Sequence, residues 1–234
     1  MSSARGVTWV VIAKAPVPGR VKTRLCPPCT PEQAADIARA ALQDTLDAVA
    51  ATPARRRMVA LDGDVPAWLP PTFDVVPQRG DGLDERLAAV FDDVHGPTLI
   101  VGMDTPQLTP ELLSSTAEAL QRDGTDAVLG PAEDGGYWVI GLDRPDPATV
   151  RGVPMSEEHT LDAQRARLDE LGLRVHDVDT LRDVDDIDDA VAVAAATPDG
   201  RFAAAVRQVV QVPGAAATTT GSPTATSPGL TTST

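Results

Sequence analysis

Two kinds of apolar pattern alternate along the first half of the chain: short unbroken runs and longer stretches with helical spacing. The short runs are rich in Val, Ile and Leu, which is typical of strands buried on both faces of a parallel sheet. They predict strands at residues 8–13, 57–61, 73–76, 98–103 and 126–129.

The stretches between these strands carry apolar residues every three to four positions, the spacing of an amphipathic helix. They predict helices at 31–51, 84–94 and 110–122. The first has a full start signal, because Thr30 can cap it, Pro31 suits its first turn and Gln33 completes a capping box. Alternating strands and helices predict an α/β fold, a mostly parallel sheet with crossover helices on both faces.

The second half departs from this rhythm. A strand at 137–142 follows the previous one after a short turn, so we expect it to run antiparallel, and a helix at 156–171, a strand at 174–178 and helices at 187–196 and 201–210 come after it. We predict one domain over residues 1–212. Residues 213–234 contain no charge and one leucine, which is too little apolar surface to offset the entropy of ordering, and they predict a disordered tail.

Charge and composition limit the function classes. The chain has 34 acidic and 20 basic side chains, a formal net charge of −14, which argues against nucleic-acid and anionic-membrane partners. No membrane-spanning run or signal peptide is evident, so we expect a cytoplasmic protein. Cys26 and Cys29 have the spacing of a redox or zinc pair, but they lie in a proline-broken loop without further ligands, so we favour neither role.

The loop at 14–24, after the first predicted strand, gathers cations in this acidic chain. It holds both lysines of the protein, Lys14 and Lys22, with Arg20 and Arg24, and Gly19 allows close backbone approach. Ligands of open α/β sheets bind beyond the carboxyl ends of the strands, so we predict a phosphate site here. The alternative is a solvated loop whose cations offset nearby acids. Neither common glycine-rich nucleotide motif is present.

A carboxylate, Asp104, follows the central strand predicted at 98–103 and precedes a helix-breaking proline. A Mg²⁺ ion bound to phosphates takes only one or two protein carboxylates, so Asp104 is the first candidate metal ligand. The acidic segment 183–189 offers the second, with Asp185 preferred and Asp183 as the weaker candidate. The local alternatives are a turn capped by Asp104 and acids that stabilise a helix dipole.

The segment 130–138, GPAEDGGYW, places two glycines after two acids and ends on two aromatic residues. Such a loop can seat a sugar or another small acceptor against its peptide groups. Asp-Gly-Gly is equally common in ordinary turns, so both interpretations stay open.

Four blocks together resemble one family: AKAPVPGRVKTRL, GMDTPQL, GPAEDGGYWVIGL and the DVDD-I-DD segment. In order and spacing they are similar to the bacterial DUF2064 proteins, which are often labelled nucleotide-diphospho-sugar transferases, over about residues 7–196. The resemblance implies a Rossmann-like three-layer sandwich of the glycosyltransferase-A type. It also implies a metal-dependent glycosyltransferase that uses a nucleotide-diphospho-sugar donor and Mg²⁺ or Mn²⁺.

The resemblance and the residues considered above together suggest roles for individual residues. The residues expected to bind nucleotide are Ala13, Lys14, Gly19, Arg20, Lys22, Thr23, Arg24, Gln78 and Arg86. The residues expected to bind the acceptor are Gly135, Gly136, Tyr137, Ser156 and His159. Asp104 and Asp185 are the expected metal ligands, and Asp104, Lys22 and Asp134 are the expected catalytic residues.

The sequence departs from the family pattern at two places. Asp84 stands where relatives prefer glycine, and Met155-Ser156-Glu157 replaces Trp-Ser-Thr, so an aromatic acceptor surface is missing or is replaced by His159.

Two other functions remain open from the sequence. Guanylyltransferases that activate phospholactate or phosphoenolpyruvate share this fold and a similar basic loop. They attack the α-phosphorus of a nucleoside triphosphate and release pyrophosphate, whereas a glycosyltransferase breaks the sugar–phosphate bond of its donor. A nucleotide-binding module without turnover is the third possibility. In each case the expected partner is a nucleotide-sugar or nucleoside triphosphate, and the sequence does not predict the acceptor or the oligomeric state.

Overall fold

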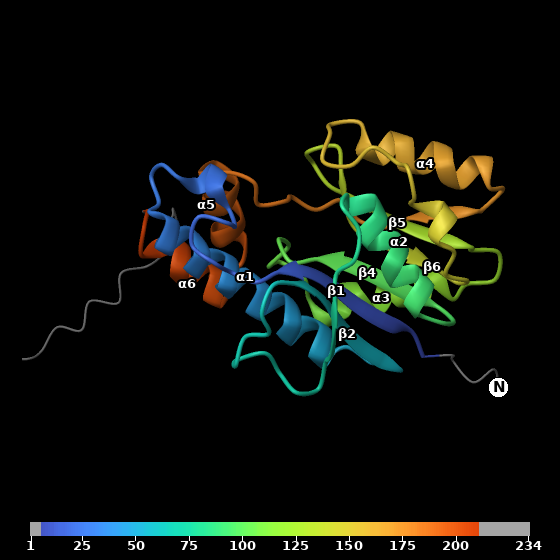
Figure 1. The fold of residues 1–234 in the computed structure, drawn as a ribbon, viewed down its shortest axis with the longest axis horizontal. Helices are drawn as coiled ribbons and strands as arrows, with labels where there is room; N and C mark the ends of the chain where they lie inside the picture. Colours follow the sequence, from blue (N-terminus) through green and yellow to red (C-terminus); the bar gives the residue numbers. More distant parts are fainter. Residues whose placement is uncertain (1–5, 211–234) are drawn as a thin grey trace, which may run out of the picture.

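A computed structural model describes residues 6–210, and its centre is a seven-stranded sheet with the order β3-β2-β1-β4-β6-β5-β7 (Figure 1). β6 runs antiparallel to both of its neighbours, and the other pairs are parallel, which confirms the predicted mostly parallel α/β sheet. The strands are β1 (Thr8–Lys14), β2 (Arg56–Asp62), β3 (Asp74–Pro77), β4 (Thr98–Gly102), β5 (Ala127–Pro131), β6 (Tyr137–Leu142) and β7 (Val175–Asp177).

All six predicted helices are present, although some of their ends differ from the prediction. The helices are α1 (Pro31–Ala51), α2 (Leu83–Asp93), α3 (Pro110–Leu120), α4 (Thr160–Glu170), α5 (Ile187–Ala196) and α6 (Arg201–Arg207), with 3-10 turns η1 (Thr23–Leu25) and η2 (Pro147–Thr149). The capping box of Thr30 and Gln33 forms as predicted. The predicted start of α4 at residue 156 is wrong, because Ser156 has a φ of 62°, a left-handed conformation that a right-handed helix excludes. α6 ends before the predicted residue 210.

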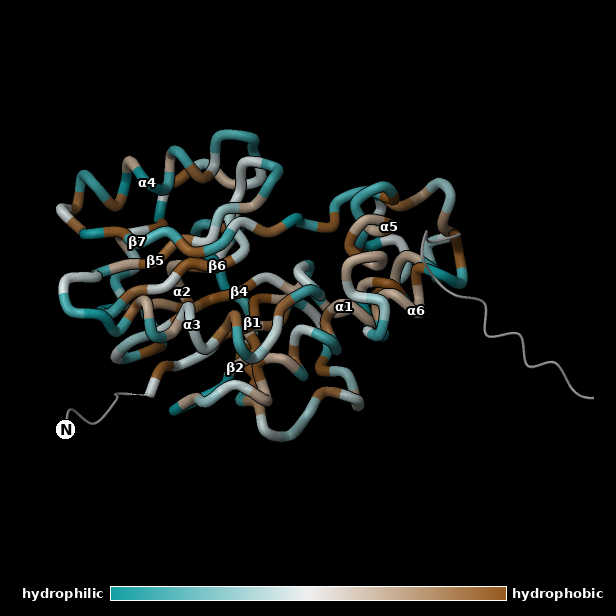
Figure 2. Tube along the Cα trace, turned by 180° about the vertical axis from the view of Figure 1, so that it is seen from behind, coloured by the Kyte–Doolittle hydropathy of each residue, from teal (hydrophilic) through white to brown (hydrophobic). Residues whose placement is uncertain are grey.

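Two apolar clusters hold the helices against opposite faces of the sheet. Along β1, Trp9 and Val11 face the cluster that contains α1 and α3, while Val10 faces the cluster that contains α2 and α4. This alternation follows from the two-residue period of a strand. In Figure 2 apolar positions are concentrated along the strands. The result is a three-layer sandwich, as the family resemblance implied.

A third apolar cluster joins α5 and α6 to the first half of α1. It includes Leu25, Cys29, Val184 and Phe202, and all four are buried. Figure 1 shows these helices grouped at one end of the molecule, beyond the sheet. Cys26 and Cys29 are free thiols within this part. The predicted domain boundary at residue 212 and the predicted tail at 213–234 lie outside the described residues.

The strand order reverses at β1: β2 and β3 lie on one side of it, and β4 and the later strands lie on the other. The loops that follow β1 and β4 therefore start side by side at the carboxyl edge and diverge, as at the ligand-binding switch point of open α/β sheets. Within residues 6–210, no helix has the length and apolarity needed to cross a membrane.

Candidate functional site

Lys22 and Asp104 meet at this switch point. The Lys22 ammonium lies 3.0 Å from Asp104 Oδ2, and the lysine side chain is only 8% exposed. The same ammonium donates a hydrogen bond to the main-chain oxygen of Val184, on the segment between β7 and α5. The φ of Lys22 is 46°, so Lys22 and Ser156 are the two non-glycine residues with left-handed backbone in the described chain. Such strain is often found at functional sites.

A second carboxylate, Asp183, shares this environment. Burial and then the negative charge of Asp104 raise the pKa of Asp183 to about 7. Burial alone would lower the pKa of Lys22, but the carboxylates around it outweigh burial, so that its pKa lies above the usual value. Lys22 therefore keeps its charge and partly compensates the partly buried acids around it.

The residues of this cluster fit a divalent cation. Asp104 Oδ1 is buried and has no hydrogen-bond partner, so one oxygen of the carboxylate has unused ligand capacity. Hard cations such as Mg²⁺ prefer carboxylate oxygens, and an ion that also binds phosphates needs only one or two of them. Residues 6–210 contain no group of three or more metal-ligating side chains, so a cation here would depend on additional ligands from substrate or water.

Asp185, the preferred second ligand from the sequence, has a different neighbour. Its carboxylate forms an ion pair with Arg24, and both side chains are substantially exposed. Asp183, whose carboxyl group feels the charge of Asp104, is therefore a second candidate beside Asp185 for the partner of Asp104. The metal-binding role of Asp185 and the nucleotide-binding role of Arg24 stay predictions.

Lys14 and Arg20 line a cavity of about 470 Å³ between the β1–α1 loop and the β2–β3 loop. The two loops are joined by a hydrogen bond from the amide of Ala15 to the main-chain oxygen of Asp62, at 2.8 Å. Gly63 makes this approach possible, because a Cβ atom there would lie 2.8 Å from that of Ala15. Gly19 and Thr23 are exposed on the same β1–α1 loop, and nothing in the structure tests their predicted contacts.

Gln78 and Arg86, both predicted to face nucleotide, belong to one hydrogen-bond network. Gln78 Nε2 donates to the main-chain oxygens of Ala13 and Ala60, at 2.8 and 2.9 Å. Arg86 donates to Gln78 Oε1 and to Asp62 Oδ2, at 3.1 and 3.0 Å. The network therefore holds Asp62 at the wall of the cavity. Sequence reasoning missed Asp62, although its position at the end of a predicted strand was a signal.

Gly135 packs the β5–β6 turn against the segment before α4. A Cβ atom on Gly135 would lie 1.9 Å from the main-chain oxygen of Glu158, and the amide of Leu161 donates to the oxygen of Gly135 at 2.8 Å. The two segments that carry the predicted acceptor residues are therefore in contact with each other at Gly135. This contact also gives the glycine pair a structural role of its own.

Other predicted acceptor and catalytic side chains have local partners. Asp134 Oδ1 accepts a hydrogen bond from the amide of Gly136 at 2.8 Å, which is an ordinary turn contact. The Tyr137 hydroxyl is buried beside Gln164 and Met155, and burial raises its pKa. His159 is exposed, and its Nε2 atom lies 3.3 Å from Glu158 Oε1. Their catalytic and acceptor roles stay predictions.

Asp84, which replaces the glycine preferred in relatives, also has a partner. Its Oδ2 accepts a hydrogen bond from the amide of Gly152 at 2.9 Å, so it links the start of α2 to the loop before α4.

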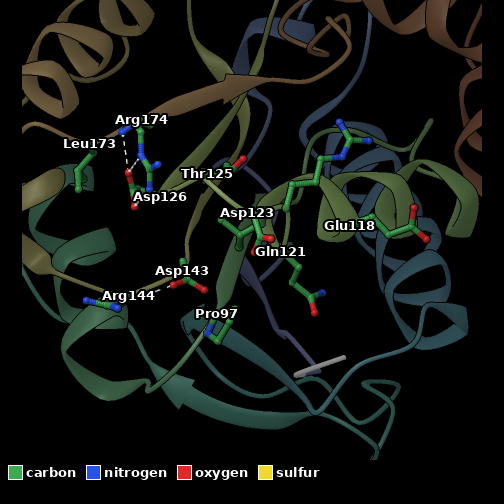
Figure 3. A pocket seen from close by; sticks show the side chains of 13 residues that line it. Pro97, Glu118, Gln121, Asp123, Thr125, Asp126, Asp143, Arg144, Leu173 and Arg174 are labelled. Carbon is green, nitrogen blue, oxygen red and sulfur yellow. Dashed lines mark hydrogen bonds and ion pairs between the residues drawn. The ribbon is translucent and has the colours of Figure 1, made fainter. Parts of the chain in front are cut away.

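A larger cavity, of about 880 Å³, lies at the opposite edge of the sheet (Figure 3). Residues before β4, β5 and β7 line it, including Pro97, Asp126 and Arg174. Asp126 and Arg174 form a close ion pair there, with Nε and Oδ2 2.7 Å apart. This edge is remote from the carboxyl ends of the parallel strands, so the smaller cavity is the better candidate despite its size.

Comparison with known proteins agrees with this fold. A family model described as uncharacterized proteins conserved in bacteria (DUF2064) matches residues 37–157. No protein with a curated description matches the chain. The structure is similar to a protein of Desulfovibrio desulfuricans G20 that is assigned as a nucleotide-diphospho-sugar transferase, with 28% identity, a TM-score of 0.76, and coverage of 87% of this chain and 97% of that one.

More distant structures share the fold alone. CMP:2-keto-3-deoxy-manno-octonic acid synthetase in complex with CTP is 14% identical, with a TM-score of 0.57 and coverage of 82% of this chain and 98% of that one. Rv0371c of Mycobacterium tuberculosis H37Rv, in complex with manganese, is 21% identical, with a TM-score of 0.54 and the same coverage of both chains. These likenesses confirm the Rossmann-like α/β fold.

Proposed function

The chain belongs to the DUF2064 family of bacterial proteins, and from its site we propose that it is a metal-dependent glycosyltransferase that uses a nucleotide-diphospho-sugar donor. The observation that carries this proposal is the cluster of Lys22, Asp104 and Asp183 at the switch point of the sheet. The resemblance to the assigned transferase of Desulfovibrio desulfuricans supports the transferase class and the type of donor.

In this proposal the cluster binds the phosphates of the donor. Asp104 and Asp183 would hold Mg²⁺ or Mn²⁺, which supplies positive charge to the phosphates as the sugar–phosphate bond breaks. Lys22 adds a fixed ammonium beside them, so that charge on the departing nucleoside diphosphate is stabilised by a group already in position. Asp134, on the exposed β5–β6 turn, orients the acceptor or removes its proton. We propose direct displacement, without a covalent intermediate.

Nucleotidyl transfer is the second candidate, and the shared fold of the CTP-bound synthetase favours it. The two reactions place phosphates in the same surroundings and differ in the bond that breaks. The product therefore distinguishes them: a nucleoside diphosphate for glycosyl transfer, and pyrophosphate for nucleotidyl transfer.

The test combines thermal shift and product analysis. The full chain is incubated with Mn²⁺ or Mg²⁺ and a panel of nucleoside triphosphates and nucleotide-diphospho-sugars, with Asp104→Asn as the matched variant. Stabilisation by a nucleotide-sugar and slow release of nucleoside diphosphate, both lost in the variant, are expected. Pyrophosphate release from a nucleoside triphosphate with a small phospho-acid would favour the second candidate. Binding without product would indicate a non-catalytic module, and no shift with any nucleotide would overturn the proposal.

A further inference from the structure

The 470 Å³ cavity beside the β1–α1 loop has an apolar wall that a phosphate site does not need. Val17 and Val65, two of the four large apolar side chains exposed in the described chain, line this cavity at 41% and 60% exposure. Trp68, half-buried on the β2–β3 loop, completes the wall. Two exposed valines beside a half-buried tryptophan that also packs against the core form a surface that indicates a ligand with a flat apolar part.

The same cavity carries cations without partners. Within residues 6–210, the side chains of Lys14 and Arg20 take part in no ion pair or hydrogen bond, although most arginines of this acidic chain are paired. Two acids also line the wall: Asp62 is already paired with Arg86 at 3.0 Å, and Asp64 forms no ion pair within the described residues. The two free cations therefore remain available to a ligand anion.

The path of the loop connects this cavity to the carboxylate cluster. Val21 lines the cavity, and the next residue, Lys22, reaches Asp104. A ligand held between Trp68 and Arg20 would therefore lie two residues along the loop from Lys22. The order is an aromatic surface, then cations, then candidate metal ligands, which matches the order of base, phosphates and bound metal in a nucleotide.

We propose, on the basis of the proposed function, that this cavity receives the nucleoside part of the donor. The base lies flat against Trp68, between Val17 and Val65, while Lys14 and Arg20 face the phosphates. Bases of every kind have a flat π-surface, so Trp68 provides affinity for nucleotides without choosing among them. A cavity of this volume is within the range of small-molecule sites.

Intrinsic fluorescence gives a direct test in the full chain. The protein has three tryptophans, and Trp9 and Trp138 are 0% and 4% exposed, so Trp68 is the one accessible reporter. With Mg²⁺ present, each of four nucleoside diphosphates with different bases is expected to quench the tryptophan emission saturably. Each is also expected to protect Trp68 from quenching by acrylamide. Pyrophosphate, which lacks a base, is expected to bind with little change in emission.

Affinity measurements by calorimetry complete the test. Trp68→Ala is expected to weaken nucleoside diphosphate binding on the order of tenfold, because the stacking surface is lost, and to leave pyrophosphate binding unchanged. Lys14→Ala and Arg20→Ala are expected to weaken both ligands. Leu171→Ala, which removes an exposed apolar side chain far along the sequence, is the control and should bind like the wild type.

The outcomes separate this inference from the proposed function. If nucleotides bind through Asp104 but neither quench nor protect Trp68, the base lies elsewhere, and this inference fails while the function stands. If Trp68→Ala weakens pyrophosphate as much as nucleotides, the stacking role is wrong. If no nucleotide binds the wild type, both fail. Acrylamide protection needs no variant, so it remains decisive even if Trp68→Ala does not fold.

Discussion

Lys22 Nζ lies 3.0 Å from Asp104 Oδ2, and this ion pair joins the loop after β1 to the end of β4. The lysine also bonds to the main-chain oxygen of Val184, so three segments that are distant in sequence meet at one ammonium. The Lys22 side chain is 8% exposed and that of Asp104 is 35% exposed, so removal of the lysine leaves a partly buried carboxylate without its compensating charge.

Lys22→Met is therefore expected to destabilise the metal-free protein by about 1–2 kcal/mol, between the values for an exposed and a fully buried pair. The reason is that Asp104 and Asp183 lose their compensating charge. A divalent cation would restore that charge, so saturating Mn²⁺ should narrow the difference in melting temperature between variant and wild type. Differential scanning fluorimetry with and without Mn²⁺ measures both effects.

The control for this experiment is Lys14→Met, because Lys14 is exposed and has no ion pair in the described chain. It should melt like the wild type in the absence of nucleotide. A Lys22→Met variant that melts at the wild-type temperature, or one whose deficit Mn²⁺ does not reduce, would contradict the interpretation of the cluster as a cation site.

The second candidate metal ligand can be identified by substitution. Asp104→Asn and Asp183→Asn are each expected to weaken Mn²⁺ binding by about tenfold or more. Substitution of residues that only hydrogen-bond to metal ligands already lowers metal affinity by about 10–100-fold. Asp185→Asn is expected to have a much smaller effect, because Asp185 pairs with Arg24. Mn²⁺ titration followed by electron paramagnetic resonance gives the affinities. If Asp185→Asn weakens Mn²⁺ binding more than Asp183→Asn does, Asp185 is the second ligand, as the sequence suggested.

Acid stability should depend on Asp126. Hydrogen bonds from the side chain and the backbone of Arg174 lower the pKa of Asp126 to about 2. A carboxyl group whose pKa is lower in the folded than in the unfolded state stabilises the fold above its unfolded pKa, near 4, and this contribution disappears as the pH falls towards 2. Asp126→Asn should therefore flatten the loss of stability between about pH 4 and pH 2.

Urea unfolding at several pH values measures this slope. Asp123→Asn, which changes another acid of the same cavity outside the Arg174 pair, is the control and should keep the wild-type slope. An unchanged slope in Asp126→Asn would show that other groups govern the acid response.

Gly135→Ala tests the contact between the β5–β6 turn and the start of α4. The φ of Gly135 is 88°, and the added Cβ would lie 1.9 Å from the oxygen of Glu158. Gly172→Ala is a matched control, because Gly172 has a φ of 70° and a Cβ added there would have no atom within 4 Å. The control is expected to cost about 1–2 kcal/mol for the left-handed backbone. Gly135→Ala should cost about 1–3 kcal/mol more for the clash, and equal costs in urea unfolding would refute the packing argument.

The order of strands and helices was predictable because buried strands and amphipathic helices impose different periods on the sequence. The reversal of β6 was also predictable, since the turn before Tyr137 is too short for a crossover. The start of α4 was not, because the left-handed backbone of Ser156 leaves no mark in the apolar pattern.

The site was predictable only in part. The two lysines, Asp104 and the acidic segment stand out by composition and by their place after strands. The sequence could not distinguish Asp183 from Asp185, because residues two apart in an extended chain are expected on the same face. Their surroundings differ only through tertiary contacts, with Asp104 acting on Asp183 and Arg24 paired with Asp185. Trp68 lies in an irregular loop, so no periodic pattern pointed to its place beside Lys14.

Val184 belongs to two parts of the molecule at once. Its side chain is buried among α1, α5 and α6, and its main-chain oxygen accepts the hydrogen bond from Lys22. During synthesis, the cationic loop and Asp104 leave the ribosome long before this carbonyl exists. A nascent chain therefore holds both charges before their common neighbour is made, and the arrangement around Lys22 is completed only when the segment between β7 and α5 folds back onto the loop after β1.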